Sequence, residues 1–139
     1  MPEVFADTGY WIALLNERDG LHARARELSE RFSAATIVTT EMVLTELLNY
    51  ASGGGRQRRR LAADAVRDWM ADANIEVVPQ TSIQFQAALE RYRARLDHSW
   101  SVVDCSSFIV METRQIQEAL AFDRHFEQAG FIALLRNGE

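Results

Sequence analysis

Four acidic side chains stand where a fold of alternating strands and helices gathers its reactive groups. Asp7 directly follows an apolar segment at 4–6, and Asp123 follows another at 119–122. Asp104 falls in the first turn of a predicted helix, and Glu46 lies on a second one. Because the carboxyl ends of parallel strands form one ligand-binding edge, we expect Asp7 and Asp123 there, within reach of the two helical acids. Carboxylate oxygens without a Cys or His cluster favour Mg²⁺ or Mn²⁺ over Zn²⁺.

Each acid also has a purely structural explanation. Asp7 and Asp123 precede predicted helices, where Asp is a preferred N-cap, and 101–104 resembles a capping box with Asp104 in place of Glu or Gln. Glu46 can be an ordinary solvated helix residue. Together these explanations are less attractive, since carboxylates converging on one sheet edge repel one another unless a divalent cation joins them. Consecutive members of the four acids are 39, 58 and 19 positions apart, so only tertiary structure can bring them together.

The elements that must position these acids alternate along the chain. Short apolar runs typical of strands buried on both faces occur at Glu3–Ala6, Thr36–Thr39, Ile75–Pro79, Glu118–Phe122 and Phe131–Leu134. Segments of helical period lie between them, at Tyr10–Leu15, Leu21–Phe32, Glu41–Ala51, Gln57–Ala73, Ser82–Leu96, Val102–Gln115 and Arg124–Gln128.

This alternation predicts an α/β fold with right-handed crossovers. We expect a three-layer α/β/α sandwich around a mainly parallel, five-stranded sheet. The 139 residues fit one domain over 1–139. The longest apolar run, Tyr10–Leu15, is too short to cross a membrane, and no secretory signal is visible at the N-terminus. With a single cysteine, Cys105, the chain is expected to be cytoplasmic.

The distribution of charge predicts an anionic partner. The net charge is −5, yet four of the 15 basic residues fall within five positions: Arg56, Arg58, Arg59 and Arg60. An acidic body with one basic patch suits a protein that concentrates carboxylates and still meets a polyanion. A solvated helix start beside the Gly-rich stretch 52–55 explains the same arginines equally well.

Four segments resemble the signature blocks of PIN-domain nucleases. They are Asp7-Thr8-Gly9, the segment Thr-Glu-Met-Val-Leu-Thr-Glu-Leu with Glu46, Trp-Ser-Val-Val-Asp-Cys-Ser-Ser-Phe with Asp104, and Ala-Phe-Asp-Arg-His-Phe-Glu-Gln-Ala-Gly-Phe with Asp123. The likeness is greatest to VapC-type toxins of toxin–antitoxin pairs, and it covers essentially the whole chain. One departure is Val103, where the third block often carries Thr.

The resemblance implies a PIN-like fold and a Mg²⁺-dependent endoribonuclease, with Mn²⁺ able to substitute. Asp7, Glu46, Asp104 and Asp123 would form the catalytic, metal-binding quartet. The implied partners are an RNA substrate, a cognate VapB-like antitoxin and a second copy in a homodimer. In this family, part of the surface of the early helices meets the antitoxin or the second subunit.

Three further side chains near the acids have alternative interpretations. Thr8 can orient a water or a carboxylate, or cap the next helix. His125 can approach the site, although an exposed helix position is the preferred interpretation. Cys105 is expected in the core, since no partner base accompanies it.

Two other functional classes remain open from the residues. A haloacid dehalogenase-like phosphatase would carry a second Asp two residues after Asp7, but Gly9 stands there, and the chain contains no lysine for a later role. An inactive PIN module that only binds RNA or protein would be expected to lose acids that this chain keeps. Mn²⁺-dependent RNA cleavage, phosphatase activity or neither would distinguish the three.

Overall fold

The sheet at the centre of the molecule is entirely parallel. The computed structural model describes residues 2–136, and within that range the strand order is β3-β2-β1-β4-β5. The predicted three-layer sandwich with a five-stranded sheet is therefore confirmed, and every strand pair in it is parallel. The strands are β1 (Glu3–Ala6), β2 (Thr36–Thr40), β3 (Ile75–Val78), β4 (Glu118–Leu120) and β5 (Ile132–Ala133).

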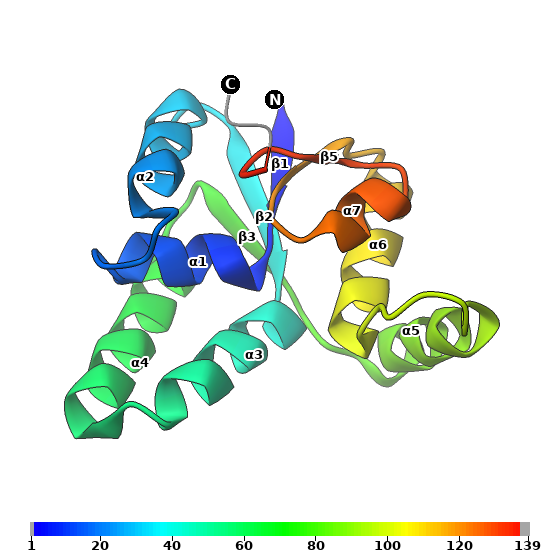
Figure 1. The fold of residues 1–139 in the computed structure, drawn as a ribbon, viewed down its shortest axis with the longest axis horizontal. Helices are drawn as coiled ribbons and strands as arrows, with labels where there is room; N and C mark the ends of the chain where they lie inside the picture. Colours follow the sequence, from blue (N-terminus) through cyan, green and yellow to red (C-terminus); the bar gives the residue numbers. More distant parts are fainter. Residues whose placement is uncertain (1, 137–139) are drawn as a thin grey trace.

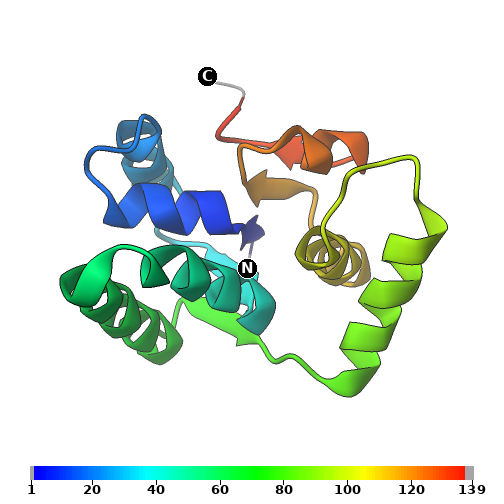
Figure 2. The ribbon, with the colours of Figure 1, turned by 60° about the horizontal axis from the view of Figure 1, so that its bottom comes forward.

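Helices cover both faces of this sheet (Figures 1 and 2). The chain runs outward from β1 to β3, then returns across β1 to β4 and β5. Because each crossover is right-handed, the reversal moves the later helices to the opposite face. One face carries α1 (Thr8–Leu15), α2 (His22–Arg31), α3 (Glu41–Ser52) and α4 (Gly55–Ala71), and the other carries α5 (Ser82–Ala94), α6 (Val102–Arg114) and α7 (Arg124–Gln128).

Some predicted element boundaries were wrong. The strand predicted to run to Phe122 ends at Leu120, and the last strand comprises only Ile132 and Ala133. Both belong to the short β4–β5 edge, where fewer residues find a partner. Helix α4 begins at Gly55 rather than at residue 57, because Gly55 adopts a φ of +89° that closes a tight turn after α3.

The core is built around the central strand. Val4, Phe5 and Ala6 of β1 are completely buried, since helices cover the sheet on both sides. Trp11 of α1 packs against Trp69 of α4, with ring centroids 4.2 Å apart. Cys105 is fully buried in the same core, as expected. No helix within residues 2–136 combines the length and apolarity needed to cross a membrane.

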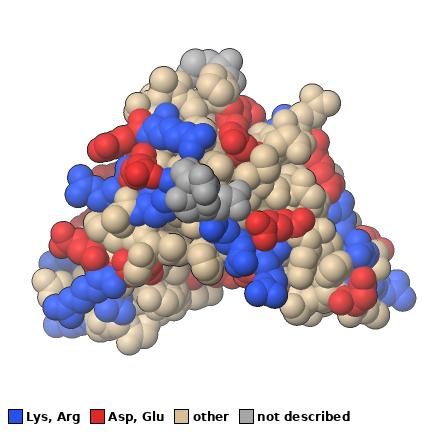
Figure 3. Space-filling model, turned by 45° about the horizontal axis from the view of Figure 1, so that its top comes forward, with Lys and Arg blue, Asp and Glu red and all other residues tan. Residues whose placement is uncertain are grey.

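Charged side chains of both signs are interspersed on the face shown in Figure 3. Elsewhere in the described residues, some arginines are paired with acids: Arg24 with Glu27, and Arg136 with Glu127. These ion pairs place arginine side chains next to acidic ones.

The strand order has a direct consequence for ligand binding. The path reverses between β1 and β4, so this pair forms the topological switch point of the sheet. Helices that follow adjacent strands here leave on opposite faces and open a crevice at the carboxyl ends. Asp7 comes directly after β1, and its backbone N–H donates to the carbonyl of Leu120, the last residue of β4 (3.1 Å).

Candidate active site

A cleft of about 760 Å³ opens at this switch point. All four predicted acids line it: Asp7, Glu46, Asp104 and Asp123. They come from four elements or junctions, namely the end of β1, α3, α6 and the start of α7. The structure thus brings together residues that are far apart in the sequence.

Asp7 and Asp104 are both buried, and Asp7 has the most unusual environment of the four acids. It occupies the N-cap position of α1, but its side chain makes no capping hydrogen bond. Its Oδ1 atom is buried without a hydrogen-bond partner among residues 2–136. Helix capping therefore does not explain this side chain, which belongs to a residue that lines the cleft.

Burial raises the pKa of Asp7 to about 8. A backbone hydrogen bond from Thr8 opposes that shift, whereas the charges of Asp104, Glu46 and Asp123 add to it. The four carboxylates therefore interact electrostatically. A charged Asp7 is unfavourable in this place unless a cation compensates for it.

Thr8 holds Glu46 in position. The Thr8 hydroxyl donates a short hydrogen bond to Glu46 Oε1 and also lies 3.5 Å from the carbonyl of Val43. Of the two roles predicted for Thr8, the structure therefore shows the one in which it orients a carboxylate. Glu46 is half-buried and directed towards α1, in contrast to an ordinary solvated helix residue.

Asp104 both caps a helix and lines the cleft. Its backbone N–H donates to Ser101 Oγ (2.9 Å), and its Oδ2 accepts from the Ser101 N–H (3.0 Å). The predicted capping box is thus present. The same Oδ2 lies 2.9 Å from His125 Nδ1, so the two explanations for Asp104 are compatible.

His125 joins two of the acids, and the preferred interpretation of an exposed helix position was wrong. Its Nδ1 lies 2.9 Å from Asp104 Oδ2 and 3.2 Å from Asp123 Oδ1. Its Nε2 lies 3.3 Å from Ser99 Oγ. Asp123 caps α7 by accepting from the His125 N–H (3.0 Å). The spacing Asp-x-His at a helix start could have predicted this position of His125. An N-cap Asp binds the backbone N–H of the residue two positions later and so brings that residue's side chain close to its own.

The site suits a divalent metal ion by its donor chemistry. Within residues 2–136, no three acidic or histidine side chains are close enough, as placed, to enclose an ion. Three of the four carboxylates are instead held by protein donors. The orphaned Oδ1 of Asp7 and the mutual repulsion of the acids nevertheless fit a hard cation with oxygen ligands. The residues present therefore fit a hard divalent cation with oxygen ligands.

The sequence matches one known family along nearly the whole chain. The PIN domain matches residues 4–132. The chain belongs to the PIN-domain family.

Among individual relatives, the chain is similar to the 23S rRNA-specific endonuclease VapC20 of Mycobacterium tuberculosis. The two are 34% identical over 132 residues, which cover 93% of this chain and 95% of VapC20, with the same values in strains CDC 1551 and H37Rv. The crystal structure of M. tuberculosis VapC20, described as a sarcin–ricin loop cleaving toxin, superposes with a TM-score of 0.79 at 30% identity. That match covers 93% of this chain and 96% of VapC20. The chain is thus a homologue of a VapC-type toxin.

The contacts of His125 yield a testable prediction. We expect His125→Ala to lower RNA cleavage by about 10- to 100-fold, because side chains that orient metal-binding carboxylates typically contribute this much. The loss should shrink at high Mn²⁺ concentration if His125 acts by positioning Asp104. Cleavage rates measured over a Mn²⁺ series check this, with His98→Ala as the control for losing a histidine. If His125→Ala and the wild type show the same Mn²⁺ dependence of cleavage, His125 has no role in the site.

Proposed function

We propose that this protein is a Mg²⁺-dependent endoribonuclease that acts as the toxin of a toxin–antitoxin pair. The observation that carries the proposal is the convergence of four carboxylates at the switch point of a PIN-domain fold, among them a buried Asp7 whose Oδ1 has no hydrogen-bond partner within residues 2–136. Asp7 and Asp104 would hold the metal ion, with Glu46 and Asp123 completing the set. Mn²⁺ is expected to substitute for Mg²⁺.

The chemistry follows from the repulsion between a phosphodiester and its nucleophile. A bound divalent ion screens the phosphate charge, activates water and stabilises the leaving oxygen. The protein's own groups orient the carboxylates: Thr8 fixes Glu46, Ser101 fixes Asp104, and His125 links Asp104 to Asp123. In hydrolysis, the water oxygen bonds to phosphorus as the bridging P–O bond breaks. A carboxylate takes the proton from the attacking water, and a solvent proton reaches the departing oxygen.

The substrate class that the relatives support is RNA. VapC20 is named for its action on 23S rRNA and on the sarcin–ricin loop, so an RNA hairpin with this loop is the first substrate to test. The phosphatase alternative has no support, since the chain belongs to the PIN-domain family. An inactive binding module is disfavoured by the presence of all four acids in one cleft.

The deciding experiment incubates the purified protein with the sarcin–ricin hairpin in Mn²⁺, Mg²⁺ or EDTA. Cleavage at a defined phosphodiester in either metal, and none in EDTA, supports the proposal. Hydrolysis of a small phosphoester without RNA cleavage would favour a phosphatase, and neither activity would favour a binding module.

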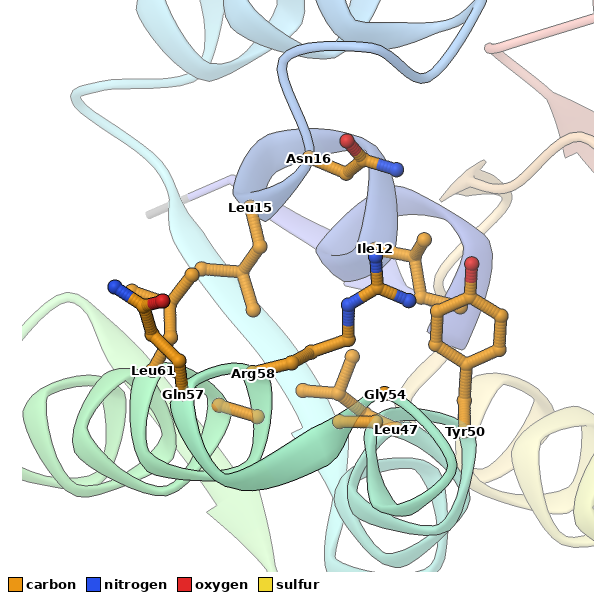
Figure 4. Close-up of a pocket in the computed structure, with 11 residues that line it drawn as sticks. Ile12, Leu15, Asn16, Leu47, Tyr50, Gly54, Gln57, Arg58 and Leu61 are labelled. Atoms are coloured by element: carbon orange, nitrogen blue, oxygen red, sulfur yellow. The ribbon is translucent and has the colours of Figure 1, made fainter.

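The arginine cluster divides into two groups in the structure. Arg58 lies across a groove beside α1 (Figure 4), and its side chain covers Gly54, where an added Cβ would come within 2.2 Å of Arg58 Cδ. Arg56, Arg59 and Arg60 line a separate surface depression at the start of α4. We propose that this second group contacts RNA phosphates. Cations at a helix N-terminus oppose the helix dipole, which favours a functional reason for their location.

The triple variant Arg56→Gln, Arg59→Gln and Arg60→Gln should weaken RNA binding and its salt dependence. Each lost phosphate contact on single-stranded RNA flattens the log–log salt slope by about 0.7, so three contacts give a change of up to roughly 2. Titrations of RNA binding at several salt concentrations measure it. Arg67→Gln, on the same helix, is the matched control. A slope equal to that of the wild type would leave these arginines as solvated helix residues.

The groove in Figure 4 fits the proposed antitoxin. It has a volume of about 430 Å³, lies between α1, α3 and α4, and is lined by Leu15, Leu47 and Leu61. It adjoins the acidic cleft, because Ile12 and Tyr50 line both. An antitoxin segment with an apolar face in the groove could extend an Arg or Lys past these residues to the carboxylates. There a cation would take the place of the metal ion.

Co-purification with the cognate antitoxin should therefore give a complex without RNase activity. Leu61→Glu should weaken this complex by about 30-fold or more, since it places a charge in the groove, and leave cleavage by the free toxin unchanged. Met70→Glu is the matched control, because Met70 is similarly exposed on the same helix but does not line the groove. Full activity of the intact complex would refute this mode of inhibition.

A further inference from the structure

Phe122 is an exposed aromatic residue that lines the acidic cleft. The apolar run that contains it predicted a strand to Phe122, and a strand covered on both faces would have buried the ring. Instead β4 ends at Leu120, Ala121 is buried, and the Phe122 side chain is 46% exposed immediately before Asp123. A large apolar ring therefore stays in contact with solvent directly beside the site.

Arg136 holds this ring from one side. Its guanidinium carbon lies over the Phe122 ring, 5.3 Å from the centroid, within the range of a cation–π interaction. Two further contacts keep the guanidinium there: its Nε pairs with Glu127 Oε1 (3.1 Å), and its Nη1 lies 3.5 Å from the Phe122 carbonyl. Because one face of the ring is covered in this way, the opposite face is the one on which a flat group can stack.

The surroundings of Phe122 suit a nucleic acid. Arg124 and Arg136 line the cleft together with Phe122, and Arg124 is exposed. These two cations offset part of the negative charge of the acids for an approaching polyanion. Proteins that bind single-stranded nucleic acid combine cations that follow the phosphates with aromatic rings on which the bases stack. Both kinds of group are present at this cleft.

We propose that Phe122 stacks on an unpaired base of the RNA substrate and so positions the adjoining phosphodiester at the acids. Phe122 would then be a positioning residue for the proposed RNase, on whose function this inference rests. Consecutive Cα atoms are about 3.8 Å apart, so a base on Phe122 belongs to a nucleotide close to the phosphate beside Asp123. Stacking needs a base that can leave its own helix, which favours loops over duplex RNA.

Phe122 is a cleaner place to test this idea than Tyr50. Tyr50 is also exposed and lines the cleft, but it borders the antitoxin groove as well (Figure 4). A change at Tyr50 would therefore alter two proposed surfaces, whereas Phe122 does not line that groove. Phe85 on α5 is the matched control, because it is an aromatic residue of similar exposure (45%) that does not line the cleft.

Phe122→Ala should weaken binding of the sarcin–ricin hairpin by roughly 5- to 100-fold, the range that the loss of one base–aromatic stack produces. Fluorescence anisotropy of the labelled hairpin in EDTA measures this affinity without cleavage. Phe122→Leu, which is apolar but has no ring, should bind as weakly as Phe122→Ala. Phe122→Trp keeps a stacking face and should bind within about 2-fold of the wild type. Phe85→Ala should bind as the wild type does.

RNA that lacks single bases identifies the stacked nucleotide. Removing one base at a time on either side of the cleaved phosphodiester should reveal a position where the wild type loses as much affinity as Phe122→Ala does on intact RNA. At that position Phe122→Ala should cause no further loss, because two changes that remove the same contact are not additive. Circular dichroism melts check that each variant folds.

The outcomes separate this inference from the proposed RNase function. Equal RNA affinity of Phe122→Ala, Phe85→Ala and a wild type that cleaves RNA would overturn the inference and leave the function intact. A wild type that neither binds nor cleaves RNA would refute both. Wild-type affinity of Phe122→Leu, or additive losses at every base-free position, would rule out stacking. Unchanged RNA binding with a weaker antitoxin complex would assign Phe122 to the antitoxin and also refute the inference.

Discussion

Replacing Asp104 with Asn is expected to lower the rate of RNA cleavage by about 1,000-fold or more, a loss of about 4 kcal/mol in transition-state stabilisation. The substitution keeps the size of the side chain and removes one charge from the cleft, where Asp104 lies beside His125. Without that charge the site holds a divalent ion less tightly, so the rise in melting temperature caused by Mn²⁺ should also shrink.

The capping role of Asp104 calls for its own control. Asn can still accept a hydrogen bond at a helix start, so Asp104→Asn should keep, or slightly raise, the stability of the metal-free protein. Ser101→Ala removes the other half of the capping box and should cost about 1 kcal/mol of stability while most of the cleavage activity remains. Near-normal, metal-stimulated cleavage by Asp104→Asn would show that the four-carboxylate site is wrong.

Asp7→Asn should stabilise the metal-free protein at neutral and higher pH while abolishing cleavage. The wild-type carboxyl has a pKa of about 8 in the folded state against an ordinary value of 3.8. Ionising it in the folded protein is therefore unfavourable, and the neutral Asn avoids that cost. The gain should reach several kcal/mol at pH 8, since each pKa unit corresponds to about 1.4 kcal/mol.

The pH dependence has a definite sign. Below pH about 4, Asp7 is protonated in both the folded and the unfolded chain and has no effect. Between pH 4 and 8, ionisation favours the unfolded chain, so the free energy of unfolding in EDTA should fall by up to about 1.4 kcal/mol per pH unit. Above pH 8 this contribution is constant. Asp7→Asn should remove this decline.

Metal should counteract the same decline, because in the proposed site it would bind the ionised carboxylate. The Mn²⁺-induced rise in melting temperature should therefore grow as the pH rises towards 8 in the wild type and stay small in Asp7→Asn. Chemical unfolding across pH, in EDTA and in Mn²⁺, measures both effects. Asp64→Asn, an exposed acid on α4, is the control. If the free energy of unfolding of Asp7→Asn and of Asp64→Asn depends on pH as it does in the wild type, the buried charge at Asp7 does not cause the decline in stability.

The sequence alone determined the fold class and singled out the four acids that the structure brings to one cleft. Strand-length apolar runs alternate with amphipathic helices, and this periodicity depends only on which residues face a core. Asp7 was locatable because it directly follows the strand-like run Val4–Ala6, and Asp104 because Ser101 starts a recognisable helix. Local pattern was thus enough to place each acid on its own element.

Tertiary structure decided the relations between these elements. The order β3-β2-β1-β4-β5 sets the switch point, but it depends on packing between distant segments that no local pattern encodes. For the same reason, the placement of His125 between Asp104 and Asp123 and the bond from Thr8 to Glu46 emerged only when α7 met α6 and α1 met α3. The raised pKa of Asp7 is the strongest case. A carboxyl group acquires its burial and its like-charged neighbours only from the folded chain around it.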